Sequence, residues 1–237
     1  MEKKMKRIGM IGGFGPESTL DYYRLLIETY HQKSGDESNP EIILYSMDIH
    51  TLLNMTDRKQ WDELVQWLVS GLEVLHKAGA DFGFFSANTP HIVFDRVEKL
   101  SPIPLISIVE ETCKHIRNLS LKKVGLLGTR STMKNDFYPK ACEKYNISVC
   151  IPNTQEQEYI HNKLMTEIEL GIFLDETRNG LLDIIKRMID KDKTEAVILG
   201  CTELPLILTQ DEFEIPFLNT SKIHVDSIIK FCLGISS

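Results

Sequence analysis

Cys201 is the residue in this sequence whose surroundings most clearly suggest chemistry. It stands in the segment Gly200-Cys201-Thr202-Glu203, directly after a strand-like apolar run, where a helix is expected to begin. A helix N-terminus lowers the pKa of a thiol and favours the basic, nucleophilic thiolate. Glu203 is close enough to orient the thiol or to accept its proton. We therefore predict Cys201 and Glu203 as catalytic residues; a buried, inert cysteine is the alternative.

The other four cysteines lie in helix-like or strand-like runs, which is typical of inert buried thiols. They are Cys113, Cys142, Cys150 and Cys232. The total of five is odd and no CxxC pair occurs, so we expect neither a disulfide framework nor a zinc or other metal site. This usage favours a reducing, cytoplasmic setting. A papain-like cysteine–histidine pair would need His91 or His224 as partner, and no signature places either one.

Small and hydroxyl residues follow four of the predicted strands. The segments are Gly12-Gly13-Phe14-Gly15, Ser86-Ala87-Asn88-Thr89, Gly128-Thr129-Arg130-Ser131-Thr132 and the Cys201 segment. Ligands of open α/β sheets bind beyond the carboxyl ends of the strands, and helix N-termini there suit carboxylates or phosphates. Each loop alone is better explained by N-caps and tight turns. Four loops in corresponding positions favour a site for a small carboxylate.

Charge and motif content exclude several other ligands. The glycine loop is neither GxGxxG nor a P-loop, which argues against nucleotides. The net charge of −7 argues against nucleic acid and anionic membranes as partners. No apolar run approaches the roughly 20 residues that span a bilayer. With these partners excluded, we expect the protein to bind a small-molecule substrate.

Strand-like and helix-like segments alternate along the chain. Strands are expected at 8–11, 42–47, 82–85, 105–108, 124–127, 148–151 and 196–199. Helices are expected at 16–33, 58–78, from about 90, up to about 118, at 132–145, in stretches between 155 and 190, and from about 221. This alternation predicts an α/β fold with mostly parallel sheets flanked by helices.

The two halves of the sequence resemble each other. Residues 6–13 are similar to 122–129, and residues 80–88 are similar to 194–202. The spacing from Ile8 to Ala87 is 79 positions, and that from Val124 to Cys201 is 77. We therefore predict two similar lobes related by a pseudo-twofold axis, with the site between them. The first lobe would comprise 1–107 plus 219–237, and the second 108–218.

Four ordered motifs resemble the aspartate/glutamate racemase family. They are residues 11–19, Asn88-Thr89-Pro90-His91, residues 128–132 and Gly200-Cys201-Thr202-Glu203-Leu204. The resemblance implies a racemase that needs no pyridoxal phosphate, metal or other cofactor, that acts on a small amino acid or carboxylate, and that forms a homodimer. It also implies two cysteines, one from each lobe, that exchange the α-proton of the substrate on opposite faces.

The resemblance and the loops together give the predicted substrate-binding residues. Those that match the carboxylate-holding positions of the family are Asn88, Thr89, Thr129, Thr132 and Thr202. The strand-end loops add Gly13, Phe14, Gly15 and Ser131.

The sequence departs from the family pattern at two places. Ala87 stands where the first-lobe cysteine precedes Asn-Thr, so water, substrate or Ser86 would have to supply the opposite proton, although Ser86 is expected to face the other way. The basic residues that hold a distal carboxylate in the family are not evident, and His50 or Arg58 are the candidate replacements.

Three functions are consistent with these residues. The leading prediction is an amino-acid racemase in which Cys201 is the acid/base. The second is a one-thiol relative, similar to the arylmalonate decarboxylases, in which a single cysteine protonates a carbanion. The third is a non-catalytic amino-acid-binding protein on the same scaffold.

Overall fold

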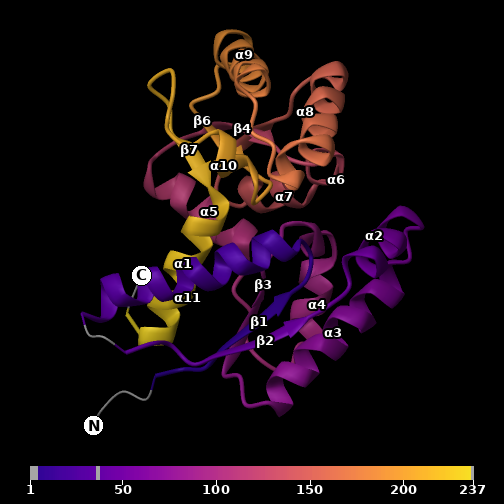
Figure 1. Ribbon diagram of the computed structural model, residues 1–237, viewed down its shortest axis with the longest axis vertical. Helices are drawn as coiled ribbons and strands as arrows, with labels where there is room; N and C mark the ends of the chain where they lie inside the picture. The colour runs from indigo at the N-terminus through magenta and orange to yellow at the C-terminus, as the bar shows by residue number, and fades with distance from the viewer. Residues whose placement is uncertain (1–4, 36–37, 236–237) are drawn as a thin grey trace. The chain divides into compact units, whose positions relative to one another are not determined.

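The computed structural model describes residues 5–35 and 38–235, which form two compact units (Figure 1). Unit 1 runs up to Ile108 and includes the segment from Ser221 onward; unit 2 is Val109–Thr220. The lobes expected from the sequence have their boundaries at 107–108 and 218–219, and their outermost residues, 1–4 and 236–237, lie outside the described part. No helix among the described residues combines the length and the apolar character needed to cross a membrane.

Unit 1 is built on a three-stranded parallel sheet in the order β2-β1-β3. Its strands are β1 (Ile8–Gly12), β2 (Ile42–Ser46) and β3 (Phe82–Phe85). Its helices are α1 (Pro16–Ser34), α2 (Ile49–Asp57), α3 (Trp61–Lys77), the 3-10 helix η1 (Thr89–Val93), α4 (Phe94–Leu100) and most of α11 (Thr220–Leu233). Every residue of β1 and β3 is buried, as is typical of a parallel sheet covered on both faces.

The two faces of this sheet pack against different helices, because strand side chains alternate between the faces. Ile11 and Phe85 join one buried cluster with the apolar face of α3. Met10 and Phe84 point the other way and pack with buried residues of α1 and α11. The helix that ends the described chain is therefore part of the core of unit 1.

Unit 2 contains a four-stranded parallel sheet in the order β5-β4-β6-β7. Its strands are β4 (Lys123–Leu127), β5 (Ser148–Cys150), β6 (Ala196–Leu199) and β7 (Phe217–Asn219). Its helices are α5 (Ile108–Asn118), α6 (Arg130–Lys134), α7 (Phe137–Glu143), α8 (Thr154–Thr166), the 3-10 helix η2 (Ile168–Leu170), α9 (Asp175–Asp192) and α10 (Leu204–Ile207). The buried residues of α8 and α9 pack in one cluster with Leu127 and Leu199 of the sheet.

The internal sequence repeat corresponds to matching strand pairs in the two units. Ile8 of β1 pairs with Phe82 of β3, and Val124 of β4 pairs with Ala196 of β6. Each of these strand pairs is parallel and extends over four residues in the same register. The α/β class with two parallel sheets flanked by helices is thus confirmed.

Several expected elements differ in the structure. The strand expected at 105–108 is reduced to one bridge between Gly83 and Leu105, because Pro102 and Pro104 restrict the backbone around it. The helix expected at 132–145 is split into α6 and α7 where Asn135 leaves the helical conformation. Helix α2 and strand β7 were not anticipated.

Gly13 allows the loop after β1 to approach the loop after β2. Its φ is +86°, and a Cβ at this position would lie 2.1 Å from the carbonyl oxygen of Met47. Gly13→Ala is expected to lower the free energy of unfolding by about 3 kcal/mol, because backbone strain and a steric clash add. Urea denaturation measures this loss.

Gly35→Ala is the matched control for that substitution. Gly35 also has a positive φ, +72°, but no atom of the described residues around it lies within 4 Å of an added Cβ. Its replacement is expected to cost only about 1 kcal/mol. Equal losses at the two positions would contradict the importance of the close approach at Gly13.

Candidate active site

Cys201 lies in the loop between β6 and α10, two positions beyond the last residue of β6. It is 8% exposed and belongs to the main buried cluster of unit 2. Helix α10 begins only at Leu204, with Glu203 as its N-cap, and it is four residues long. The expectation that a helix begins at Cys201 is therefore wrong.

The pKa of the Cys201 thiol is raised well above its usual value, the reverse of the sequence prediction. Burial is the largest cause, followed by the negative charge of Glu203, the hydrogen bond to Glu203 and the charge of Glu169. A desolvated thiolate beside carboxylates is costly, whereas a helix dipole acts only within the first turn. Cys201 therefore rests as a neutral thiol, which can donate a proton but must lose one before it acts as a base.

Glu203 is the hydrogen-bond partner of this thiol. Cys201 Sγ donates to Glu203 Oε2 at 2.9 Å, and Thr202 Oγ1 donates to the same oxygen at 2.8 Å. The Glu203 side chain is buried, so its carboxylate has little competing water. This geometry allows Glu203 to take the thiol proton, one of the two roles foreseen from its position in the sequence.

Glu169 is a third member of the cluster, which the sequence reading missed. A carboxylate oxygen of Glu169, Cys201 Sγ and a carboxylate oxygen of Glu203 all lie within 4.8 Å of one another. Burial, and next the charge of Glu203, raise the pKa of Glu169 to about 7. In the sequence, only the pair Glu167 and Glu169 near a helix end could have pointed to this carboxyl group. Of the two, Glu167 binds Lys163 and Thr177 and does not join the cluster.

The raised pKa of Glu169 predicts a pH-dependent effect on stability. Since the folded-state pKa of about 7 exceeds the ordinary 4.5, the folded protein binds this proton more tightly. The stabilisation is complete below the unfolded-state pKa and is lost as the pH rises through about 7. Glu169→Gln should therefore raise the free energy of unfolding at pH ~8 by about 1 kcal/mol, a figure discounted for partial solvent screening.

Urea denaturation at two pH values checks this, with Glu167→Gln as control. At pH ~4.5, where most of Glu169 is protonated in the folded state, the variant should match the parent. Glu167→Gln removes bonds to Lys163 and Thr177, so we expect it to lower stability at pH ~8. A Glu169→Gln effect of the same size at both pH values would contradict the assigned pKa.

The same three side chains are potential metal ligands. Zinc binds thiolate and carboxylate oxygen, and Glu169, Cys201 and Glu203 each offer one such atom. None of the three is a histidine, the neutral ligand usual in catalytic zinc sites. The absence of a metal therefore stays a prediction, to be checked by assays with and without a chelator.

Hydroxyl residues from the loop after β4 lie next to the Cys201 loop. Thr129 caps α6, and its Oγ1 accepts from Thr132 N at 3.4 Å and lies 3.2 Å from Thr132 Oγ1. A Cβ at Gly200 would lie 3.0 Å from the Thr132 methyl group and 2.9 Å from the Leu127 carbonyl oxygen. The absence of a side chain at Gly200 therefore lets the two loops of unit 2 meet.

Ser131 has a more local environment. Its carbonyl oxygen accepts from the Asn135 side-chain amide at 2.8 Å, and its Oγ lies 3.4 Å from the same amide nitrogen. These bonds end α6. The predicted contact of Ser131 with substrate stays a prediction.

The glycine loop of unit 1 has evident structural roles. Gly13 N donates to Thr19 Oγ1 at 2.9 Å, so this backbone donor is already used. Phe14 is buried in the core, with its ring 5.9 Å from that of Trp67. Gly15 caps α1 with a φ of 131°. Their predicted contacts with substrate remain predictions.

The loop after β3 occupies the corresponding place in unit 1. Ala87 is two positions beyond the strand and 7% exposed, like Cys201 in unit 2. Ser86 is fully buried, and its Oγ lies 3.4 Å from Thr19 Oγ1 of α1. Asn88 is buried and caps η1, which begins at Thr89. Ser86 therefore faces α1, the orientation expected from the sequence, and is poorly placed to supply a proton at the strand end.

The two candidate histidines are buried in unit 1. His224 lies 2.9 Å from the Tyr22 hydroxyl through Nδ1 and 3.0 Å from the Ile106 carbonyl oxygen through Nε2, so both of its nitrogens are engaged. His91 stacks on Phe94 with ring centroids 4.8 Å apart. Burial lowers the pKa of His91 to about 3 and that of His224 to about 4. Both are therefore neutral at physiological pH.

The segment after β2 presents an anion rather than a cation. Asp48 caps α2 and accepts from His50 N at 3.2 Å and from Thr51 N at 2.9 Å. His50 and Arg58 are exposed on and just after this helix. Their predicted role in binding a distal carboxylate stays a prediction.

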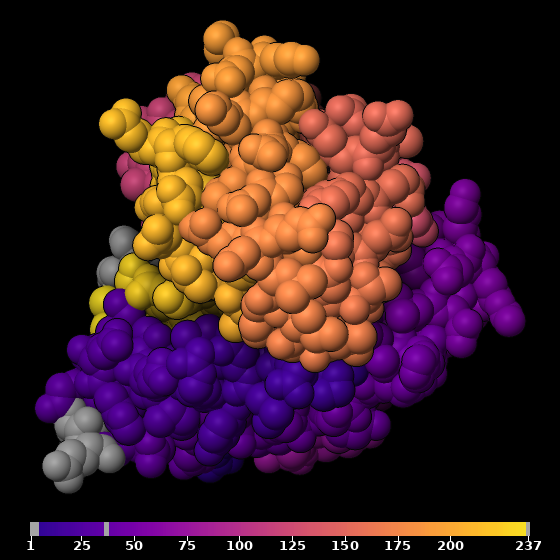
Figure 2. All heavy atoms as spheres, turned by 45° about the horizontal axis from the view of Figure 1, so that its top comes forward, coloured from indigo at the N-terminus to yellow at the C-terminus, as the bar shows by residue number. Residues whose placement is uncertain are grey.

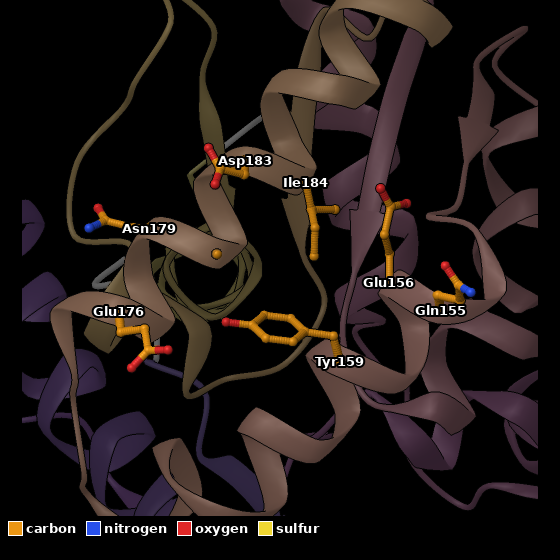
Figure 3. A pocket seen from close by; sticks show the side chains of 8 residues that line it. Gln155, Glu156, Tyr159, Glu176, Asn179, Asp183 and Ile184 are labelled. Atoms are coloured by element: carbon orange, nitrogen blue, oxygen red, sulfur yellow. The ribbon is translucent and has the colours of Figure 1, made fainter.

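A surface pocket of unit 2 is separate from these residues. It has a volume of about 760 Å³ and lies between α8 and α9, with Tyr159 projecting across it (Figure 3). None of the predicted site residues lines it. We favour the cluster at Cys201 over this pocket as the active site, because among the described residues it is the place where a thiol and two carboxyl groups converge.

Comparison with known proteins supports the sequence resemblance. The chain is 28% identical over 235 residues to the broad specificity amino-acid racemase RacX of Bacillus subtilis strain 168, with 97% of this chain and 100% of the relative covered. The solved structure of an aspartate racemase homologue from Pyrococcus horikoshii OT3 is 34% identical with a TM-score of 0.86, covering 96% of this chain and 99% of that one.

More distant proteins share the fold. The glutamate racemase of Aquifex pyrophilus has a TM-score of 0.63 at 20% identity, covering 95% of this chain and 83% of that one. The model of the Asp/Glu/Hydantoin racemase family matches residues 11–228, nearly the whole chain. The protein therefore belongs to the Asp/Glu/Hydantoin racemase family.

Proposed function

We propose that the protein is a cofactor-independent amino-acid isomerase in which Cys201 exchanges the α-proton of the substrate. Membership of the racemase family supports amino-acid racemase activity. The observation that carries the assignment to Cys201 is the buried cluster in which its thiol donates to Glu203 beside Glu169. Clusters of titratable groups with strongly shifted pKa values are typical of acid–base sites.

The substrate carboxylate would be held by hydroxyl and amide donors. In unit 2 these are Thr129, Thr132 and Thr202, which stand on the two adjoining loops around Cys201. Asn88 and Thr89 of unit 1 are the further residues that the proposal assigns. Such donors matter because removal of the α-proton moves negative charge onto the carboxylate, and donors already in place stabilise that charge.

The proton path starts from the resting thiol. Glu203 takes the proton from Cys201 Sγ along their 2.9 Å hydrogen bond, which leaves a thiolate. The thiolate then takes the proton from Cα, and the electron pair of the broken C–H bond is delocalised into the substrate carboxylate. Return of the proton from Sγ to the same face regenerates the starting enantiomer. Inversion requires a proton on the opposite face.

Because residue 87 is an alanine, a two-thiol mechanism lacks a side-chain donor for the proton on the face opposite Cys201. An alanine carries no exchangeable side-chain proton, and Ser86 beside it is buried against α1. We propose that water delivers the opposite proton while Cys201 keeps the α-proton, and that the hydroxide so formed takes up, through solvent, the proton held by Glu203. Inversion would then be slower than exchange. The same observation supports a second candidate, a decarboxylase in which Cys201 protonates the carbanion left by loss of CO2.

Proton–deuteron exchange in D2O tests the proposal. Each enantiomer of an amino acid is incubated with the protein, loss of the Cα–H signal is followed by NMR, and inversion is followed by chiral chromatography. Exchange that outpaces inversion supports the one-thiol mechanism. Exchange of neither enantiomer, together with CO2 release from substituted malonates, would favour the decarboxylase.

A further inference from the structure

The charged groups that act on Cys201 in unit 2 are all anionic. A carboxylate oxygen of Glu203 lies 2.9 Å from Cys201 Sγ, and one of Glu169 lies within 4.8 Å of it; no cation is among the charges that act on the thiol within the described residues. Two cations of the elements on either side are paired elsewhere. Lys163 pairs with Glu167, and Arg178 of α9 pairs with Glu212. A substrate side chain with its own carboxylate would therefore meet like charges without a counter-ion.

The chain directly after Glu169 is apolar and exposed. Leu170 is 68% exposed, and the residues that follow it before α9 include three more large exposed apolar side chains, Ile172, Phe173 and Leu174. Figure 2 shows this part of the chain, in salmon to orange, at the surface of unit 2. Four large exposed apolar side chains within five residues are unusual on the surface of a soluble protein and indicate that the segment binds another molecule.

This apolar segment, 170–174, begins at the thiol cluster. Its first residue ends η2, whose preceding residue Glu169 reaches Cys201 and Glu203. Helix η2 also packs against α10, which follows directly from the Cys201 loop and exposes the apolar Leu206. Apolar surface and negative charge therefore adjoin the same thiol.

We propose that the site accepts amino acids with uncharged, apolar side chains and discriminates against aspartate and glutamate, with the substrate side chain lying against the apolar segment 170–174. This inference rests on the proposed function, since it specifies the substrate of the same thiol. The α-ammonium group suits the two carboxyl groups, whereas a second substrate carboxylate is repelled by them. A discrimination of about tenfold or more in kcat/KM is expected from one such unrelieved like-charge contact.

The test uses exchange in D2O with pairs of substrates matched in size. Leucine and methionine are compared with aspartate and glutamate, and asparagine and glutamine serve as uncharged controls of the same shape as the acids. We expect leucine and methionine to have the highest kcat/KM and asparagine to exceed aspartate by about tenfold. Lysine and arginine complete the panel, and all assays are run with and without EDTA.

The outcomes separate this inference from the proposed function. Exchange of no amino acid would overturn the proposed function itself. Exchange in which aspartate or glutamate equals or exceeds leucine would leave Cys201 as the acid/base but overturn the inference. Faster exchange of lysine or arginine than of leucine would overturn the apolar role of segment 170–174.

Variants locate the effect on the segment. Two variants, Phe173→Ala and Leu170→Ala, should each raise the KM for leucine about tenfold. The KM for alanine as substrate should change little, because only the longer side chain of leucine loses apolar contact. Leu119→Ala removes an apolar side chain of unit 2 outside the segment that is about as exposed as Phe173, and it should change the KM of neither substrate. Leu170→Lys should reduce the difference in kcat/KM between aspartate and asparagine, because it adds a counter-ion for the side-chain carboxylate. If a folded Leu170→Lys variant kept the parental ratio of kcat/KM for asparagine and aspartate, like-charge repulsion would not be the cause of the discrimination.

Discussion

Replacing Cys201 by alanine is expected to slow α-proton exchange about 1,000-fold, since positioned acid–base groups typically contribute effects of this size. The loss should appear mainly in kcat, because the carboxylate donors remain in place. Cys201→Ser should behave similarly: serine can keep the hydrogen bond to Glu203, but its hydroxyl is far less acidic than a thiol. NMR exchange in D2O with both enantiomers measures the effect.

The control for this loss is another cysteine of the same unit. Cys150 is partly buried at the end of β5, and burial raises its pKa, so it shares the chemistry of Cys201 without its neighbours. Cys150→Ser should leave exchange within about twofold of the parent. A folded Cys201→Ala protein, checked by its melting temperature, that still exchanges at the parental rate would show that another residue removes the α-proton.

Adding a thiol at Ala87 is expected to have the opposite effect. Ala87 and Cys201 are each the second residue after a strand in the same register, and they are 7% and 8% exposed. Ala87→Cys therefore places a thiol at the position of unit 1 that corresponds to Cys201. We expect the ratio of inversion to exchange to rise about 100-fold, because a positioned acid replaces water.

The neighbouring residue supplies the control for Ala87→Cys. Ser86→Cys adds the same group one position earlier, where the side chain faces Thr19 of α1, so the ratio should not change. Chiral chromatography measures inversion, and NMR measures exchange in the same samples. If Ala87→Cys folds and exchanges protons but inverts no faster than its parent, the correspondence between Ala87 and Cys201 does not extend to their chemistry.

Strands β1 to β6 could be predicted from the sequence because they are short, continuous apolar runs, whereas the three-residue β7 was missed. The helix boundaries could not, since they depend on local backbone geometry. The helix expected from residue 58 begins at Trp61, because Lys59 has a positive φ of 55° and interrupts it. The preceding α2 depends on the Asp48 side chain, which accepts the first free backbone N–H groups.

The candidate site was only partly predictable for a different reason. Cys201, Thr202 and Glu203 are adjacent in sequence, and the internal repeat identified the Cys201 position in both halves. Glu169 comes from a distant 3-10 helix, and only tertiary packing brings its carboxylate to the thiol. The predicted direction of the Cys201 pKa shift was wrong, because burial and two carboxyl groups outweigh any effect of a helix N-terminus.

The place of α11 in the core of unit 1 has a consequence for how the chain is made. The ribosome must synthesise all of unit 2, residues 109–220, before it reaches Val225, Ile228 and Ile229, which complete the cluster on one face of the first sheet. Until then, Met10 and Phe84 lack part of their covering. Unit 2 is continuous in sequence, so it can finish folding during translation, whereas unit 1 begins first and is completed last.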